Sequence, residues 1–250
     1  MGQKRALITG ASSGIGREFA LQLSKEGYQI TAVARNEGRL KELVQALGAG
    51  SQYRVADLST AEGVDATASE LGAQHYDLLI NNAGFGVQGR FFETPLQKQV
   101  EMLDVNVKAL VTLSHAFLVR AQPGDALINL SSGLAFLPMP AIGLYAATKA
   151  LVTSFSESLW YEQKSRGVYV MGLCPGITDT SFSKNSGGGD LTAPKAMIQT
   201  AEQVVTKALR ELKARRKPTV LSGLMNTLFG FTARFRSRRS VVSQMGSITP

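Results

Sequence analysis

Tyr145 and Lys149 stand four positions apart in the segment 131–149, SSGLAFLPMPAIGLYAATK, and form a pair that could move a proton. In a helix, residues four apart lie on the same face. A free tyrosine titrates near ~10, and a positive charge within ~4–6 Å favours its phenolate form. We therefore expect Lys149 to lower the pKa of Tyr145 toward the range in which acid–base catalysis is efficient.

Ser132 adds a hydroxyl group thirteen residues before the tyrosine. It closes the apolar run 125–132, DALINLSS, which we interpret as a strand. At the end of a strand, its hydroxyl could donate a hydrogen bond to an oxygen on which negative charge develops during a reaction. Tyrosine and lysine at helical spacing also occur by chance, so at this point an ordinary helix without chemistry remains the alternative.

A glycine-rich turn near the N-terminus predicts a binding site for a dinucleotide. The apolar run 4–9 is followed by glycines and then by 17–27, REFALQLSKEG, which has helical periodicity. Glycines between a strand and a helix permit a tight turn and close approach of a ligand, and the helix start suits a pyrophosphate. The turn residues expected to bind the cofactor are Gly10, Ser12, Ser13, Gly14, Ile15 and Gly16.

The end of the second strand indicates which dinucleotide is bound. The run 28–35, YQITAVAR, ends in Arg35 and Asn36, and no Asp or Glu occurs at 33–36. A carboxylate at this position selects the ribose hydroxyl of NAD, whereas an arginine suits the 2′-phosphate of NADP. We therefore expect NADP(H), with a simple surface role for Arg35 as the alternative.

Two further strands end in polar residues that could reach the same ligand. The run 51–57, SQYRVAD, closes at Asp57 and Leu58, and the run 77–84, DLLINNAG, closes at Asn82, Ala83 and Gly84. Open parallel sheets bind ligands beyond the carboxyl ends of their strands, at the point where the strand order reverses. An Asn-Asn-Ala-Gly sequence can also be a plain turn, and alone it would not indicate a site.

The chain resembles the short-chain dehydrogenase/reductase family, of the NADP(H)-preferring type, over about residues 4–222. The motifs that carry the resemblance follow the family's order and spacing: Thr9-Gly10, Gly14-Ile15-Gly16, Asp57, Asn81-Asn82-Ala83-Gly84, Asn106, Ser132, Tyr145 with Lys149, and Pro175-Gly176. The resemblance implies a single-domain α/β Rossmann fold, a doubly wound, seven-stranded, mostly parallel sheet in the order 3-2-1-4-5-6-7 with helices on both faces. It also implies hydride transfer between a nicotinamide and a carbonyl or alcohol.

The resemblance assigns roles to particular residues. The matching asparagine, Asn106, holds a water that links the lysine to solvent, and Ile177 and Thr180 match positions that touch the nicotinamide carboxamide and the phosphates. The expected catalytic residues are Asn106, Ser132, Tyr145 and Lys149. The expected cofactor-binding residues beyond the glycine turn are Arg35, Asn36, Asp57, Leu58, Asn82, Ala83, Gly84, Tyr145, Lys149, Pro175, Ile177 and Thr180.

Composition limits the remaining possibilities. The 250 residues are 44% apolar and 18% charged, which is ordinary for a globular chain. The single cysteine, Cys174, excludes a disulfide framework, and we expect no metal site because no acid at ligand spacing joins His75 or His115. The first strand begins almost at the start, and no run approaches the ~18 apolar residues of a membrane span. We expect a cytoplasmic protein, at most peripheral at a membrane.

The positive charge is concentrated near the C-terminus. The formal charge is +8, and residues 207–239 contain ten Lys or Arg against one acid, Glu211, which makes a general nucleic-acid patch less probable than a local feature. We divide the chain into a catalytic domain, 1–222, and a basic amphipathic extension, 223–250. The extension could pack on its own domain or on another subunit, lie on a membrane surface, or be a frayed tail.

The expected reaction is reduction of a hydrophobic aldehyde or ketone by NADPH. Tyr145 would deliver a proton to the oxygen, and a glycine-rich segment, 181–195, would act as a lid. The apolar residues expected to line the substrate pocket are Phe85, Leu134, Phe136, Leu137 and Met139. Two alternatives stay open: a 3-oxoacyl thioester substrate, and an NADP-sensing module without catalysis that acts through its basic tail. The resemblance also implies a homodimer or homotetramer.

Overall fold

The computed structural model describes residues 3–187, 194, 197–223 and 236–248 of the chain. A central sheet forms mainly from short apolar runs that are buried on both faces, which is the pattern of parallel strands, whereas the run 52–55 at its edge is partly exposed. These strands are β1 (Arg5–Thr9), β2 (Gln29–Ala34), β3 (Gln52–Val55), β4 (Leu78–Asn81), β5 (Ala126–Leu130), β6 (Tyr169–Cys174) and β9 (Thr219–Leu221). They lie in the order β3-β2-β1-β4-β5-β6-β9, and each strand is parallel to its neighbours.

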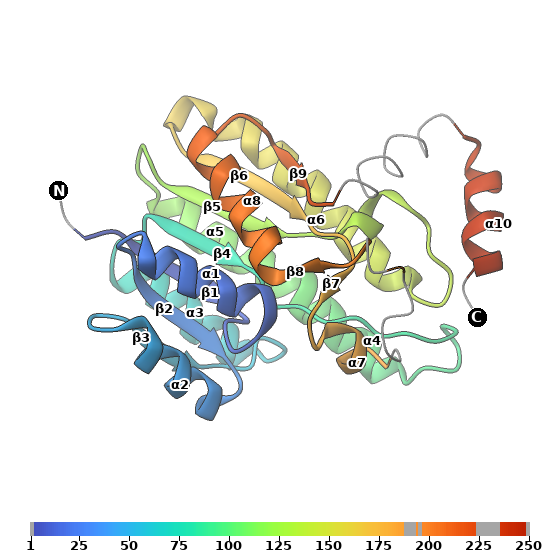
Figure 1. Cartoon of the computed structure of the whole chain (residues 1–250), viewed down its shortest axis with the longest axis horizontal. Coiled ribbons are helices and arrows are strands. Elements are labelled where there is room, and N and C mark those ends of the chain that lie inside the picture. The colour runs from blue at the N-terminus through green and yellow to red at the C-terminus, as the bar shows by residue number, and fades with distance from the viewer. Residues whose placement is uncertain (1–2, 188–193, 195–196, 224–235, 249–250) are drawn as a thin grey trace.

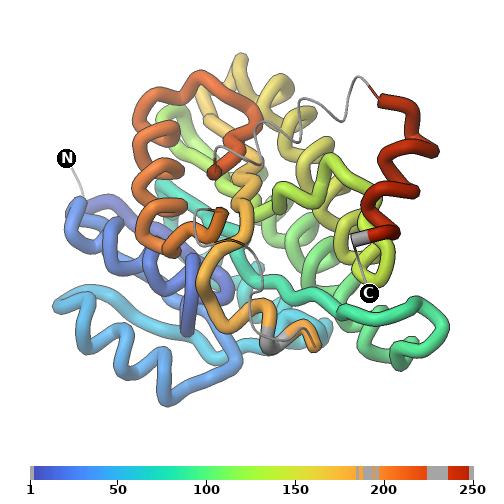
Figure 2. The backbone as a smooth tube through the Cα atoms, turned by 45° about the vertical axis from the view of Figure 1, so that its right-hand side comes forward, coloured from blue at the N-terminus to red at the C-terminus, as the bar shows by residue number. Residues whose placement is uncertain are grey.

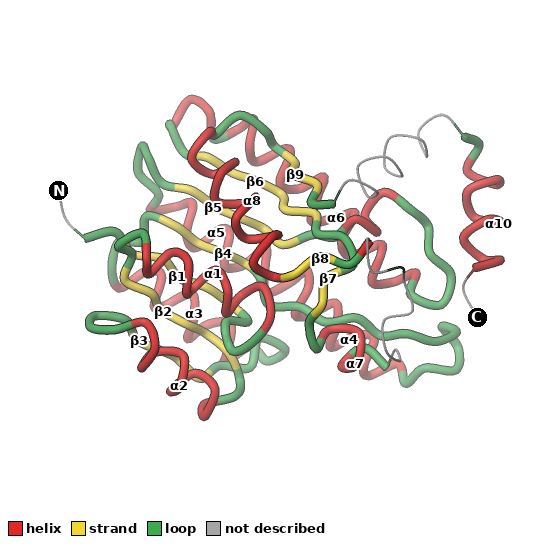
Figure 3. Tube along the Cα trace, viewed as in Figure 1, coloured by secondary structure: helices red, strands yellow, loops and turns green. Residues whose placement is uncertain are grey.

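Helices cover both faces of this sheet (Figure 1; Figure 3). The longer helices are α1 (Gly14–Lys25), α2 (Glu37–Leu47), α3 (Ala61–Ala73), α4 (Leu96–Leu103), α5 (Leu110–Arg120), α6 (Gly143–Glu162), α8 (Ala201–Ala214) and α10 (Arg238–Ile248). One core joins α1, α2 and α8 to the sheet, and the other joins α3, α5 and α6 to its opposite face. Successive strand residues alternate between the two cores: Leu7 faces one and Ile8 the other.

Side-chain caps fix where several helices begin. Asn36 accepts a hydrogen bond from the backbone of Arg39 at the start of α2, and Thr60 does the same for α3. Thr200 and Gln203 form a capping box at the start of α8. The shorter helical turns are a π-helical turn at Asp104–Ala109, 3₁₀ turns at Gly133–Phe136 and Lys164–Arg166, and α7 (Phe182–Asn185).

One continuous helix, Leu96–Arg120, has the length and composition of a membrane span. The sequence analysis expected no such segment, because Lys98, Glu101, Asp104 and Lys108 interrupt the apolar run. In the structure this helix includes α4, the π-helical turn and α5, and its inner side chains, Leu113 and Phe117, are buried in the core. It is therefore a core helix of the domain.

The expected fold is confirmed, with one difference in the sheet. The seventh strand of the sheet is β9, since β7 (Thr178–Asp179) and β8 (Gln199–Thr200) form a separate two-stranded sheet that the sequence did not indicate. The helix of Tyr145 begins at Gly143, so the tyrosine lies in its first turn. In the described part of the extension, α10 buries Val241 and Met245, so this part packs on its own domain, as in the first of the three alternatives.

Candidate active site

The glycine turn is held against the end of β4 by Thr9 and Asn82. The Thr9 hydroxyl accepts hydrogen bonds from the backbone N–H groups of Asn82 and Ala83, each at 3.0 Å. The Asn82 side chain donates to the carbonyl oxygens of Thr9 and Gly10. Gly10 has φ +66°, and a Cβ there would lie 2.9 Å from the Cα of Ala83, so only glycine fits. Strands 1 and 4 are thus joined at the predicted switch point.

The start of α1 is shaped to accept a ligand. Its N-cap, Ser13, makes no side-chain hydrogen bond to the helix, and its first turn has no acidic residue. A Cβ on Gly14 would lie 3.2 Å from the Thr180 methyl group, so the segment after β6 lies over this turn. Because a helix start with uncapped N–H groups attracts anions, the turn suits a pyrophosphate. Thr180 lies beside this turn, and its contact with the phosphates stays a prediction.

Arg35, at the end of β2, is exposed and lies beside Asp57, at the end of β3. Its guanidinium is 3.7 Å from the Asp57 carboxylate. Hydrogen bonds from Ser59, together with this guanidinium, hold the pKa of Asp57 below its usual value even though burial opposes them. Asn36 uses its side chain to cap α2, so its predicted cofactor contact stays a prediction.

Tyr145, Lys149 and Ser132 meet beyond the end of β5. The Ser132 hydroxyl lies beside the Tyr145 phenol, close enough to act on the pKa of the tyrosine. The Lys149 amine lies 5.6 Å from the centroid of the tyrosine ring and donates to the Leu130 carbonyl at 2.8 Å. Both Tyr145 and Lys149 are buried, on one face of α6. The predicted serine, tyrosine and lysine are therefore brought together.

The expected direction of the tyrosine pKa shift is wrong in this structure. Burial raises the pKa of Tyr145 to about 12, although the nearby Ser132 hydroxyl acts in the opposite direction. Burial also lowers the pKa of Lys149 to about 8. Desolvation disfavours both charged forms, and it is the largest cause of both shifts. Tyr145 is therefore a protonated acid at neutral pH.

Asn106 sits in the π-helical turn between α4 and α5 and is completely buried. Its side chain accepts from the N–H of Phe85 at 3.0 Å and donates to the Phe85 carbonyl at 2.9 Å. A Cβ on Gly84 would lie 2.9 Å from the Asn106 side-chain oxygen and 3.4 Å from the Lys149 amine. The segment 82–84 thus has the glycine turn on one side and the Asn106–Lys149 pair on the other.

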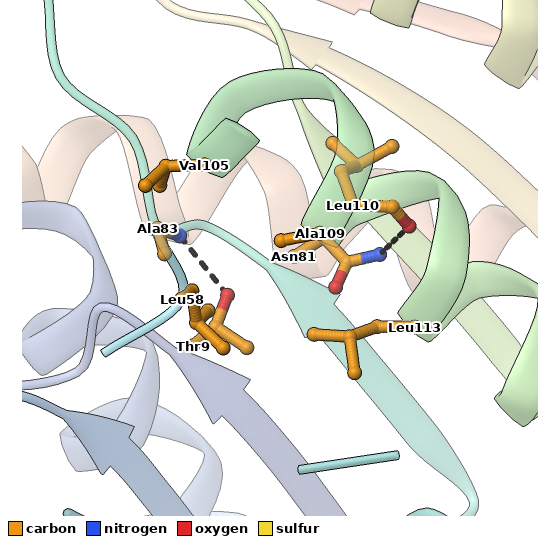
Figure 4. A pocket seen from close by; sticks show the side chains of 8 residues that line it. All are labelled: Thr9, Leu58, Asn81, Ala83, Val105, Ala109, Leu110 and Leu113. Atoms are coloured by element: carbon orange, nitrogen blue, oxygen red, sulfur yellow. Dashed lines mark hydrogen bonds between the residues drawn. The ribbon is translucent and has the colours of Figure 1, made fainter. Parts of the chain in front are cut away.

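A small pocket lies where β4 ends against this helix (Figure 4). Two residues predicted to bind the cofactor, Leu58 and Ala83, line it together with Val105. Its floor is polar at Asn81, whose side chain donates to the Leu110 carbonyl and whose own oxygen has no partner among the described residues.

Some residues of the site were missed by the sequence analysis. The Phe182 ring, in α7, lies 5.4 Å from the Tyr145 ring, and Ser186 accepts a hydrogen bond from Gly86. No sequence signal could have found these contacts, because they join segments that are 37 and 100 positions apart along the chain. The proposed lid falls partly on residues 188–193 and 195–196, which lie outside the described residues.

The remaining predicted residues lie around this centre. The 3₁₀ turn Gly133–Phe136 follows Ser132 and carries two of the apolar residues expected to line the substrate pocket. The backbone N–H of Phe85, a third such residue, donates a hydrogen bond to Asn106. The Pro175 carbonyl accepts from the Gly133 backbone at 2.8 Å, and Ile177 is exposed beyond it.

His75 does have acidic neighbours, which corrects the sequence analysis. His75, Asp77 and Asp125 place possible ligand atoms within 4.8 Å of one another, at the amino ends of the strands. His75 lies 3.3 Å from the Asp125 carboxylate, and the other carboxylate, Asp77, accepts from the backbone of Arg5. The spacing along the chain hid this cluster because Asp125 precedes a different strand.

A doubly wound parallel sheet, with a glycine turn at its switch point and a buried Ser/Tyr/Lys group beside it, is the arrangement of a dinucleotide-binding oxidoreductase domain. The chain belongs to the short chain dehydrogenase family, whose family model matches residues 4–191.

Individual relatives agree with this assignment. The chain is 37% identical over 188 residues to the "Probable oxidoreductase EphD" of Mycobacterium tuberculosis, which covers 72% of this chain but only 32% of that protein. The chain therefore spans about a third of the length of the first curated relatives. It is 33% identical over 190 residues to the "Very-long-chain 3-oxoacyl-CoA reductase" of Laccaria bicolor, covering 72% of this chain and 56% of that one. The structure is similar to that of a short-chain dehydrogenase from Sphingobium yanoikuyae solved with NADPH, with a TM-score of 0.84 and 28% sequence identity. The match covers 96% of this chain and 95% of that one.

Proposed function

We propose that the protein reduces the carbonyl group of a hydrophobic aldehyde or ketone with NADPH, or oxidises the corresponding alcohol. The observation that supports this most directly is the grouping of Ser132, Tyr145 and Lys149, with the Lys149 amine 5.6 Å from the centroid of the tyrosine ring. These groups can hold a carbonyl oxygen and supply its proton. Such a set has no use in a protein that only binds a dinucleotide, which argues against the sensing alternative.

The residues at the sheet edge fit NADP(H). A Cβ at Gly10 or Gly16 would clash with Asn82, so the two glycines let the turn pack against the end of β4. The helix start has no side-chain cap that would compete with a phosphate. Arg35 offers an exposed guanidinium at the position that selects a 2′-phosphate. The Sphingobium yanoikuyae relative was solved with NADPH, which supports the same choice. When bound, the nicotinamide would supply the hydride.

The protein's own groups would then manage the proton and the charge. Tyr145 holds its proton firmly and would release it to the carbonyl oxygen only as negative charge grows there. Ser132 would donate a hydrogen bond to the same oxygen. Lys149 is kept in position by the Leu130 carbonyl, and its ammonium would stabilise the phenolate left behind. Asn106 would support the path that restores the proton.

The apolar residues after Ser132 support a hydrophobic substrate, and the 3-oxoacyl thioester is the main alternative. It is supported by the Laccaria bicolor relative and by the basic segment 207–217. The ionic strength of the assay separates the two. The Michaelis constant of an anionic thioester should rise with added salt, whereas that of a neutral ketone should not.

The test is a panel of aldehydes, ketones and 3-oxoacyl thioesters, followed by the loss of NADPH absorbance and repeated with NADH. We expect turnover with at least one hydrophobic carbonyl, and a higher kcat/KM with NADPH. An Arg35→Ala variant should lose that preference for NADPH. Absence of turnover across the panel, with NADPH binding intact, would instead favour the sensing role.

A further inference from the structure

Two phenylalanines lie exposed in the turn before α4. Phe91 is 64% exposed and Phe92 81%, and Leu96, one helical turn further on, is 69% exposed. We refer to Phe91, Phe92 and Leu96 as the aromatic tip. Large apolar side chains that gather on a surface mark an interaction site, whereas single ones are ordinary.

The aromatic tip belongs to the same end of the molecule as the substrate-side loop and the C-terminal helix. Gly89, just before the tip, donates to the Ala141 carbonyl at 2.8 Å, and Ala141 leads into the helix of Tyr145. A Cβ on Gly246, in α10, would lie 3.6 Å from Pro140. Figures 1 and 2 show the loop before α4 (green) and α10 (red) at this shared end.

The charge on α10 favours a negatively charged partner. No Asp or Glu follows Glu211 in the sequence, whereas eight Lys or Arg do. Among the described residues, Arg236, Arg238 and Arg239 are exposed at the start of α10, while Val241 and Met245 fix the helix to the domain. Val242 adds an exposed apolar side chain next to these arginines.

We propose that this end of the protein docks on an anionic lipid bilayer. The aromatic tip would enter the boundary between headgroups and acyl chains, and the arginines of α10 would face the headgroups. Aromatic side chains are well suited to that boundary. The mouth of the site would then open toward the bilayer and could receive an apolar carbonyl compound from it. This last consequence rests on the proposed function, whereas the docking itself does not.

Sedimentation with vesicles tests the docking. Vesicles of equal parts phosphatidylglycerol and phosphatidylcholine should bind the protein, and added salt should release it. The double variant Phe91→Ser, Phe92→Ser should bind about tenfold more weakly or worse, since two rings leave the interface. Arg238→Gln and Arg239→Gln should each weaken binding roughly fivefold. The matched controls, Val119→Ser and Lys25→Gln, remove an exposed valine and an exposed charge elsewhere and should change nothing.

A second measurement keeps an aromatic side chain at the tip and follows its surroundings directly. In a Phe92→Trp, Trp160→Phe variant, tryptophan emission should shift to the blue on addition of anionic vesicles. The proposal is overturned if the wild-type protein does not bind the vesicles, or if the tip variants bind them like the wild type. It is also overturned if the tip variants change only the oligomeric mass of the protein in solution, which would mean that the tip contacts a second copy. Vesicle binding without turnover of any carbonyl would refute the proposed function and leave the docking intact.

Discussion

Tyr145 and Tyr161 lie on the same helix but in opposite surroundings: the first is buried beside Ser132, and the second is 72% exposed. Replacing Tyr145 with Phe removes the proton donor and little volume. General acid catalysis contributes typically ~10²–10⁴-fold, so carbonyl reduction should fall by that factor. NADPH affinity, measured by fluorescence titration, should stay within about twofold if the fold is intact. Tyr161→Phe is the control and should keep full activity; a Tyr145→Phe enzyme at half the normal rate would remove the tyrosine from the mechanism.

Lys149 gives a prediction about stability and pH. Its pKa is about 8 in the folded protein and 10.5 when unperturbed, so below pH 8 both states are charged and burial of the charge destabilises the fold. This penalty fades as the pH rises from 8 to 10.5. Lys149→Met should therefore increase the free energy of unfolding at pH 7 by about 1–3 kcal/mol, after the loss of the bond to Leu130 is counted.

Urea unfolding at pH 7 and at pH 10 measures the effect, with exposed Lys25→Met as the control. The gain from Lys149→Met should be largest at pH 7 and should shrink toward pH 10. A variant less stable than the wild type at pH 7 would mean that the amine stabilises the fold. Activity should fall in the same variant, as expected where a catalytic group is held in an unfavourable setting.

The candidate site residues could be predicted from the sequence because the motifs that carry their chemistry have a fixed spacing along the chain. Tyr145 and Lys149 are one helical turn apart, and Gly10 must adopt a positive φ between strand and helix. The direction of the tyrosine pKa shift was not predictable, because burial depends on segments distant in sequence. Phe182 is such a neighbour, since its ring lies against Tyr145 from a short helix without strong periodicity.

At the scale of elements, a buried polar network joins the sheet to the helices that bear the catalytic residues. Asn81 of β4 and Asn129 of β5 are paired across the strands and hydrogen-bonded at 3.0 Å. The Ser114 hydroxyl of α5 accepts from Asn81, and that of Ser156 in α6 accepts from Asn129 at 3.1 Å. Because α5 follows Asn106 and α6 contains Tyr145, the network fixes both helices relative to the sheet.

Ser156→Ala tests this network. It would leave the Asn129 amide short of a buried partner, so the free energy of unfolding should fall by about 1–3 kcal/mol. Ser158→Ala is a close control on the same helix: both hydroxyls donate to the carbonyl four residues earlier, but Ser158 is exposed and should change little. Equal effects of the two variants in urea unfolding would mean that the bond to Asn129 does not stabilise the fold. Sequence could suggest neither partner, because the network forms only when the strands pair.

At the scale of the whole molecule, exposed apolar residues run along two adjacent helices. Val100, Leu103 and Val111 lie on one stripe of the α4–α5 helix, and Leu151 is exposed on α6 next to it. The expected homodimer or homotetramer would bury such a stripe. The stripe continues from the aromatic tip, because Leu96 is the first residue of α4 and lies one helical turn before Val100.

We propose that this stripe is the contact with a second copy, and Leu151 tests it. Leu151 is 44% exposed, so Leu151→Glu costs little in a monomer but would bury an unpaired charge in an assembly. Size-exclusion chromatography with light scattering should show an assembly for the wild type and a halved mass for the variant at the same concentration. Val119→Glu is the control, because Val119 is 66% exposed near the end of α5 and should leave the mass unchanged. A wild-type monomer, or an unchanged mass in Leu151→Glu, would exclude this stripe as the contact, and turnover by the dissociated variant would show that each subunit holds a complete site.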